Sequence, residues 1–173
     1  MKITRMRVPV FVSCPTNLSP EQEASARIIM RHLNKNKLEW RALGRSDYPR
    51  NLPLREVLRL IKHCSGGVIL GFEQFKAPAG VHRRGTSKEA EPDGPIVMPT
   101  PWNHLEAGIL FNQKLPILIF REPGIEGGIF DLGITDVFIH MMPTPGMSRE
   151  ASDDLDTVFQ VWASEVRHYY YED

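Results

Sequence analysis

Residues 100–110, TPWNHLEAGIL, lead directly into residues 115–120, LPILIF, and these two stretches decide how the chain folds. The first has the apolar spacing of a helix around a single acid, Glu106, and the second is the continuous apolar run of a buried strand. The side chains expected near Glu106 at about 100° per residue are Trp102, Leu105, Ile109 and Leu110. Burying a carboxylate alone is too costly, so we expect Glu106 either to line a site or to be a paired structural acid.

Upstream of this helix, strand patterns alternate with helix patterns. Apolar runs predict strands at residues 8–14, 38–43 and 67–72. Helices are predicted between them at residues 19–35, which open on a capping box of Ser19 and Gln22, and from Pro53 to about residue 64. Residues 73–99 hold prolines, glycines and a charged run without periodicity. We expect a lid or a disordered loop there and assign it no helix or strand.

Downstream, a Gly-rich loop at residues 121–128 and a weak segment near 129–132 precede a short strand at 137–140 and a helix at 149–170. Short crossover helices return successive strands in one direction, so this alternation requires a mostly parallel sheet with both faces covered. We therefore predict an α/β fold. It is a three-layer domain over residues 1–173 with a five-stranded, mostly parallel sheet and an insertion at about 73–99.

Ligands bind beyond the carboxyl ends of the strands in such sheets, and this rule predicts where a site should lie. The loops at that edge are residues 13–19, 44–53, 72–103 and 121–128, and Glu106 follows the third of them. The side chains there that we expect to contact a ligand are Ser13, Cys14, Thr16, Arg45, Ser46, Asp47, Phe72, Trp102 and Asn103. For several of them a structural role is the alternative: a solvated turn at residues 45–47, and a core aromatic at Phe72 or Trp102.

Composition limits the function classes. The 21 basic and 21 acidic residues balance, so no overall field favours nucleic acid or an anionic membrane. Cys14 and Cys64 lack the spacing of metal ligands, and we expect reduced thiols, a cytoplasmic location and no metal. The basic start followed by an apolar run predicts a strand rather than a signal peptide, because Pro9 interrupts it and no small-residue cleavage site follows. No segment reaches the roughly 18 apolar residues that a membrane span requires.

Three features together carry a resemblance to known families. They are the strand-loop start FVSCP at residues 11–15, the polar loop after the second strand, and the pattern Trp-Asn-x-x-Glu-x-Gly at residues 102–108 before LPILIF. With them the chain resembles the TIR and TIR-like domains of bacterial immune systems. It is similar, more distantly, to the nucleoside 2-deoxyribosyltransferase-like enzymes that share their flavodoxin-like architecture. In those families this helix carries the catalytic glutamate, which implies that role for Glu106, beside Asn103 and Gly108.

The TIR resemblance implies an enzyme that cleaves the N-glycosidic bond of NAD and yields ADP-ribose or a cyclic ADP-ribose in antiviral defence. Such a bond breaks with positive charge on the ribosyl ring, which a fixed carboxylate stabilises. NAD would be a substrate and no cofactor is expected; the partners expected are a second copy of the chain or a separate sensor or effector protein. One alternative is a nucleoside 2-deoxyribosyltransferase or nucleotide N-glycosidase with Glu106 as nucleophile. Another is a non-enzymatic nucleotide-sensing or assembly module in which Glu106 pairs with Arg45 or Arg121.

Overall fold

The computed structural model describes residues 7–47 and 52–172, and its main sheet has five parallel strands in the order β2-β1-β3-β6-β7. The strands are β1 (Val8–Ser13), β2 (Leu38–Arg41), β3 (Gly67–Gly71), β6 (Ile117–Arg121) and β7 (Ile139–Met141). Counted within this sheet the order is 2-1-3-4-5, which is that of the flavodoxin-like fold. The predicted α/β fold is therefore confirmed, and the sheet is parallel throughout.

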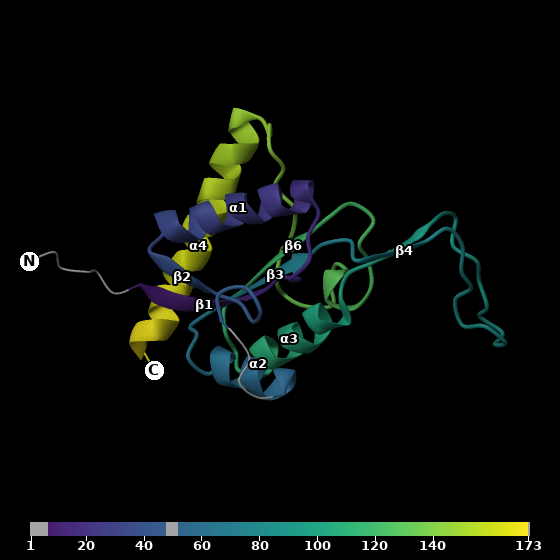
Figure 1. The fold of residues 1–173 in the computed structure, drawn as a ribbon, viewed down its shortest axis with the longest axis horizontal. Helices are drawn as coiled ribbons and strands as arrows, with labels where there is room; N and C mark the ends of the chain where they lie inside the picture. The colour runs from purple at the N-terminus through teal and green to yellow at the C-terminus, as the bar shows by residue number, and fades with distance from the viewer. Residues whose placement is uncertain (1–6, 48–51, 173) are drawn as a thin grey trace, which may run out of the picture.

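Helices cover both faces of the sheet (Figure 1). Helices α1 (Pro20–Lys35) and α4 (Arg149–Glu172) lie on one face, and α2 (Pro53–Ile61) and α3 (Pro101–Asn112) lie on the other. The predicted capping box is present at α1, where the Gln22 backbone N–H donates to Ser19 Oγ and the Ser19 N–H donates to the Gln22 side chain. None of the helices in the described part of the chain combines the length and apolarity needed to cross a bilayer.

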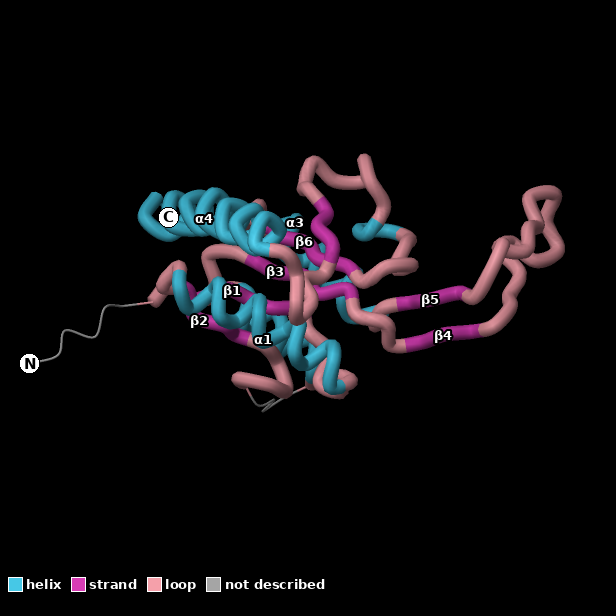
Figure 2. The backbone as a smooth tube through the Cα atoms, turned by 90° about the horizontal axis from the view of Figure 1, so that it is seen from above, coloured by secondary structure: helices cyan, strands magenta, loops and turns pink. Residues whose placement is uncertain are grey.

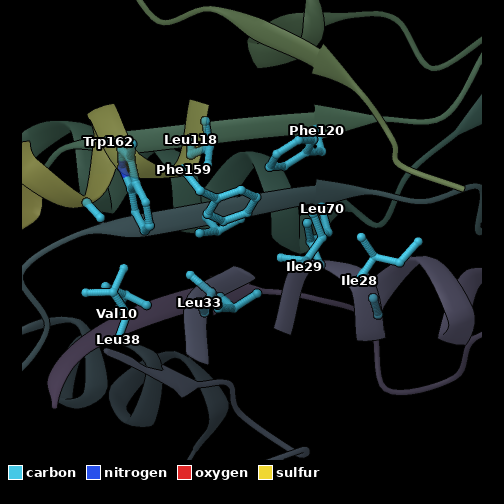
Figure 3. Packing of buried hydrophobic residues seen from close by; sticks show 14 of the residues in the cluster. Val10, Ile28, Ile29, Leu33, Leu38, Leu70, Leu118, Phe120, Phe159 and Trp162 are labelled. Carbon is cyan, nitrogen blue, oxygen red and sulfur yellow. The ribbon is translucent and has the colours of Figure 1, made fainter. Parts of the chain in front are cut away.

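The larger hydrophobic core lies between the sheet and the pair α1 and α4. In Figure 3, Phe159 and Trp162 of α4 lie against Leu118 and Phe120 of β6. The rings of Phe159 and Phe120 stack with their centroids 5.8 Å apart. A second core on the opposite face joins β1, β3 and β6 to α2 and α3. Alternate strand residues point to opposite faces, so β1, β3 and β6 each contribute to both cores.

A close contact between α3 and β3 helps to fix the position of Glu106. A Cβ added to Gly67 would lie 2.4 Å from Leu110 Cδ1, so only a residue without a side chain allows α3 to pack this near the strand. Thr100 is the N-cap of helix α3, and its hydroxyl accepts a hydrogen bond from the Trp102 N–H, with Pro101 in the first helical position. The helix is thereby held over β3 with its first turns at the carboxyl edge of the sheet.

The segment 73–99 differs from the prediction. It forms a two-stranded antiparallel ribbon of β4 (Phe75–Ala77) and β5 (Ile96–Met98), and His82 bridges Ala90 further out. We call residues 73–99 the arm; it projects away from the main sheet (Figures 1 and 2). The expectation of no strand there was wrong, because strands of three residues are too short to show an alternating pattern in the sequence.

Other element boundaries differ by one to three residues, the largest difference being at α2, which was expected to reach about residue 64 and ends at Ile61. The strands expected at 38–43, 115–120 and 137–140 are Leu38–Arg41, Ile117–Arg121 and Ile139–Met141. The weak segment near 129–132 is a single turn of 3-10 helix, η1 (Gly128–Phe130). Of the polar loop expected at 45–51, residues 48–51 lie outside the described residues, as do residues 1–6 of the expected N-terminal segment. Such shifts are usual at element ends, where hydrogen bonding fades gradually.

Candidate functional site

A cavity of about 340 Å³ lies beyond the carboxyl ends of β1, β2 and β3. Strands β2 and β3 flank β1 on opposite sides, which makes this the point where the strand order reverses and where open α/β sheets bind ligands. The residues that line it are Ser13, Cys14, Pro15, Thr16, Asn17, Leu43, Gly44, Pro53, Gln74, Thr100, Trp102 and Glu106. Among these described residues, Glu106 is the only acidic or basic one.

Glu106 is a buried acid that faces this cavity from the second turn of α3, with 7% of its surface exposed. Burial raises the pKa of Glu106 to about 7, while a hydrogen bond with the Ser13 side chain opposes this shift. None of the ion pairs between described residues includes Glu106. Its carboxyl group is therefore close to half ionised at neutral pH, and no cationic side chain in the described part of the chain forms an ion pair with it.

Asn103 holds Ser13 beside this acid. Asn103 is fully buried, and its Nδ2 donates to Ser13 Oγ at 2.7 Å. The same amide group reaches the carbonyl oxygens of Ser13 at 3.5 Å and Leu70 at 3.4 Å, so it joins the ends of β1 and β3. Because Ser13 Oγ accepts from Asn103, its own proton is free to be donated to Glu106. Asn103 thus orients a hydroxyl that favours the ionised form of the acid.

The burial of Glu106 has a measurable consequence for stability. Its folded-state pKa lies above the unfolded value, so the folded state binds the extra proton between pH 4.5 and 7 and stability falls as pH rises through that window. We expect the unfolding free energy of the wild type to lose roughly 2–3 kcal/mol between pH 5 and 8 relative to Glu106→Gln. Urea denaturation of both proteins across this range measures the difference. If the difference in unfolding free energy between the wild type and Glu106→Gln does not change with pH, the Glu106 carboxyl group is solvated.

The loops after β1 and β2 are fastened together by Arg45. Its guanidinium donates to the Pro15 carbonyl at 2.7 Å and to the Thr16 carbonyl at 3.3 Å, and it pairs with Glu23 at 2.7 Å. Gly44 touches the same loop, since a Cβ there would lie 2.6 Å from Thr16 Cγ2, and its φ of +74° favours glycine. Arg45 therefore does not line the cavity itself but holds in place the backbone of Pro15 and Thr16, which do.

The structure brings together only part of the predicted site. Ser13, Cys14, Thr16, Trp102 and Glu106 line the cavity, and Asn103 lies directly beneath it. Burial raises the pKa of Cys14 to about 12, so this residue is a thiol at neutral pH. Trp102 is 40% exposed, while Leu105, which we expected near Glu106, is also largely exposed and does not line the cavity.

Besides Arg45, which does not line the cavity, three of the expected site residues lie elsewhere. Ser46 and Asp47 are absent from the cavity lining; the Ser46 hydroxyl bonds to Asp47 and to Ala42, and Asp47 pairs with Arg41. These contacts fold the loop back on itself, so it presents Leu43 and Gly44 to the cavity instead. Phe72 is fully buried in the core beside α1 and α4.

Sequence reasoning did not single out several lining residues: Pro15, Asn17, Leu43, Gly44, Pro53, Gln74 and Thr100. The available signal was their position, since all but Leu43 fall within the loops expected at the carboxyl edge or beside the start of α3. Residue type gave no comparable signal, because small and polar residues occur in most loops. Among the described residues, no group of three or more His, Cys, Asp or Glu side chains is placed to hold a metal ion.

The pairing of Glu106 with Arg45 or Arg121 does not occur in the structure. Arg45 bonds to Glu23, and Arg121 Nη1 donates to the carbonyl oxygens of Ile125 at 2.8 Å and Phe130 at 2.9 Å. Arg121 thereby closes the Gly-rich loop at residues 121–128. His104, on the same helix as Glu106, packs edge-on against Phe130 with ring centroids 5.5 Å apart. Both arginines have structural roles outside the cavity.

Comparison with known proteins adds little to this geometry. No known protein family matches the chain, and no curated protein matches it. Among solved structures, the chain is similar to the crystal structure of diflavin flavoprotein A3 from Nostoc sp., with 14% sequence identity, coverage of 96% of this chain and 97% of that chain, and a TM-score of 0.46. The fold assignment therefore depends on the strand order described above, and any functional assignment depends on the cavity.

Proposed function

We propose that this protein cleaves the N-glycosidic bond between nicotinamide and ribose in NAD, with Glu106 as the catalytic carboxylate. One observation carries the proposal: among the described residues that line a cavity at the ligand-binding edge of the sheet, a buried acid outside every described ion pair is the only acidic or basic one. Strongly perturbed carboxyl groups in clefts are typical of catalytic acids and bases. The resemblance of the helix pattern to that of TIR domains supports the same role.

The charge of the cavity favours a cationic ligand. The pyridinium ring of NAD carries a positive charge, and the ribosyl ring becomes positive as the bond breaks. A carboxylate in a partly desolvated site attracts both charges more strongly than it would in water. Since no basic residue is among the described lining residues, the phosphates of NAD would lie outside the cavity, toward its mouth. Its volume of about 340 Å³ is at the lower end of small-molecule sites and suits one nucleoside half of the molecule.

The proposed reaction balances without a redox step. The bond between C1′ of the ribose and the pyridinium nitrogen breaks, and its electron pair leaves with the nitrogen as neutral nicotinamide. Glu106 stabilises the oxocarbenium-like ribosyl group, and the Ser13 hydroxyl helps to keep this acid ionised. Water then adds to C1′ and loses its proton to solvent, which yields ADP-ribose. Attack by the adenine of the same molecule would instead yield a cyclic ADP-ribose, the type of signal that the TIR resemblance implies in antiviral defence.

The decisive experiment follows free base from two substrate classes. Purified protein is incubated with NAD and, separately, with 2′-deoxynucleosides, and the released bases are separated by chromatography. Release of nicotinamide supports the proposal. Release or exchange of bases from deoxynucleosides alone would favour the second candidate, a nucleoside 2-deoxyribosyltransferase. The size of the cavity is consistent with this candidate, because it suits a single nucleoside. Absence of base release from either class, over a range of protein concentrations, would contradict both enzymatic functions.

Trp102 is expected to contact the leaving base. It lies one helical turn before Glu106, lines the cavity and remains 40% exposed, which leaves its ring available for stacking. We expect Trp102→Ala to lower kcat/KM for NAD by about threefold to tenfold, mostly through KM, since an aromatic pair contributes about 0.5–1.5 kcal/mol. Trp102→Phe should retain most of the activity. Steady-state kinetics of both variants check this, and unchanged KM in Trp102→Ala would place the base elsewhere.

A further inference from the structure

The outer end of the arm is a basic turn. A bridge between His82 and Ala90 closes this turn, with the His82 N–H donating to the Ala90 carbonyl at 2.8 Å and the Ala90 N–H donating back at 3.1 Å. We call residues 83–89, RRGTSKE, the tip, and all of them are exposed. The basic residues of the tip are Arg83, Arg84 and Lys88, and its acid is Glu89. The tip therefore carries excess positive charge, although the charges of the whole chain balance.

The cations of the tip are available to a ligand. In the described part of the chain, none of the ion pairs includes any of them. The Glu89 carboxylate instead accepts a hydrogen bond from the Gly85 backbone N–H within the turn. The next acids along the chain, Glu91 and Asp93, lie on the domain side of the bridge. The cations of the tip thus face solvent without a carboxylate partner among the described residues.

Hydrogen bonds within the tip fix its shape. Thr86 Oγ1 donates to the Arg83 carbonyl at 2.8 Å and accepts from the Lys88 N–H at 3.2 Å. The Glu89 N–H donates to the Thr86 carbonyl at 3.1 Å, and Gly85 adopts a φ of +78°, which favours glycine. The turn is therefore formed before any ligand binds, which lowers the entropy that binding must remove.

The base of the arm is firmly held. The Glu73 N–H donates to Glu122 Oε2 at 2.6 Å, and Gln22 Nε2 donates to the Glu73 carbonyl at 3.1 Å and to the same Glu122 oxygen at 3.0 Å. Helix α1 and the end of β6 therefore fix the direction in which the arm leaves the domain. The tip lies away from the main sheet (Figures 1 and 2), and none of its residues lines the cavity.

The composition of the tip distinguishes between classes of anionic partner. Residues 83–89 include no apolar side chain, so the tip has nothing to insert into a membrane and lacks the apolar anchor of a typical protein interface. They include no aromatic ring either, so the bases of a single strand would find no stacking surface. Basic and hydroxyl side chains on a turn are instead typical of contacts with the phosphates of a duplex.

The shape of the arm favours DNA over RNA. A two-stranded β-ribbon fits the major groove of B-form DNA, which is about 12 Å wide. The major groove of an A-form RNA helix is too narrow for it, and the wide groove of that helix is shallow. The arm is two-stranded at β4 and β5 and again at the bridge below the tip. Double-stranded DNA is therefore the anion whose form suits the arm.

We propose that the arm is a DNA-binding element, in which the tip contacts the phosphates of double-stranded DNA through Arg83, Arg84 and Lys88 without reading the sequence. Glu91 and Asp93 would repel the phosphates if the arm entered more deeply, so the contact is limited to the tip. Three phosphate contacts predict that the association constant falls roughly fortyfold between about 50 and 200 mM salt. The proposal does not depend on the activity proposed above.

The first test locates the contact. Fluorescence anisotropy of a short labelled DNA duplex, titrated with the full chain at low salt, measures the dissociation constant. The double variant Arg83→Glu with Arg84→Glu should raise this constant more than tenfold, because two contacts are lost and two repulsions are added. The matched control is Arg55→Glu with Lys62→Glu, which makes the same change in net charge at exposed positions of α2 and the residue after it. The control should bind DNA like the wild type.

The second test counts the contacts. Lys88→Gln removes one cation without adding a charge, so the association constant should then fall only roughly twelvefold between about 50 and 200 mM salt. This readout compares one variant with itself at two salt concentrations. A loss of binding through misfolding would leave no salt dependence to measure, and circular dichroism of each variant checks the fold directly.

The third test identifies the partner. Unlabelled competitors are added to the complex of the wild type with the labelled duplex: the same duplex, one of its single strands, an RNA duplex of the same sequence, and polyglutamate. The DNA duplex should displace the label at the lowest concentration of phosphate groups. Displacement by polyglutamate at an equal or lower concentration of carboxylate groups would instead indicate an acidic protein as partner.

The proposal is overturned by any of four results. One is a wild type that does not bind the DNA duplex at low salt. Another is equal weakening by the control on α2, which would reduce the binding to overall charge. The others are an unchanged salt dependence in Lys88→Gln, and stronger competition by the single strand, the RNA duplex or polyglutamate than by the DNA duplex.

Discussion

Replacement of Glu106 by Gln is expected to lower kcat/KM for NAD by roughly a hundredfold to ten-thousandfold, the range for removal of a positioned charged group at a reacting centre. The substitution keeps the shape of the side chain and its capacity to accept a hydrogen bond, but removes the negative charge that would face the ribosyl cation. Folding should remain intact, because the change also removes the cost of burying an ionised carboxylate. Glu126→Gln, in an exposed position of the Gly-rich loop, is the matched control and should retain full activity.

The pH profile provides an independent check of the same role. Below its pKa of about 7, Glu106 is mostly protonated and cannot stabilise a cation, so kcat/KM of the wild type should rise about tenfold per pH unit up to pH 7 and then level off. A bound pyridinium ion favours the ionised carboxylate, so the kcat profile should shift to lower pH. Rates that are independent of pH between 5 and 8, or base release that persists in Glu106→Gln, would remove this residue from the mechanism.

Replacement of Asn103 by Asp is expected to destabilise the fold by about 3–5 kcal/mol at pH 8, the range for a buried charge without a partner. The amide nitrogen of Asn103 donates toward the carbonyl oxygens of Ser13 and Leu70, and a carboxylate oxygen in its place would repel both. The new charge would also lie one helical turn from Glu106, with Ser13 between them. Repulsion and burial together raise the pKa of the introduced acid.

The sign of the pH dependence distinguishes this mechanism from a simple loss of packing. A protonated carboxyl group can still donate to one of the carbonyl oxygens, so the destabilisation by Asn103→Asp should shrink as pH is lowered to 5. The comparison variant Asn103→Ala removes the donor without adding a charge, and should cost about 1–3 kcal/mol at both pH values. Urea denaturation at pH 5 and pH 8 measures all three proteins. Equal losses for Asn103→Asp at the two pH values would contradict a buried charge at this position.

Most helices and main-sheet strands could be predicted from local sequence patterns. Apolar runs located β1, β3 and β6, helical periodicity located α1, α3 and α4, and Ser19 with Gln22 marked a helix start that the structure confirms. Alternation of these elements implied a parallel sheet and hence the edge at which the cavity lies. The strand pattern at residues 67–72 also predicts the position of Phe72. Residues two apart in a strand share a face, so Phe72 lies on the same face as Leu70, which belongs to the core rather than to the cavity.

The sequence by itself determined the order of the helices and of the main-sheet strands along the chain, a mostly parallel α/β sheet and the placement of Glu106 at its carboxyl edge, because periodicity and helix caps act between residues close in the chain. Only the tertiary structure decided the partners of Arg45 and Asp47, the path by which Asn103 reaches Ser13, and the pairing of β4 with β5. These contacts join separate helices, strands and loops, in most cases distant in sequence, and they leave no periodic signal in the chain. The chain pattern thus locates the buried acid, whereas the folded loops decide what surrounds it.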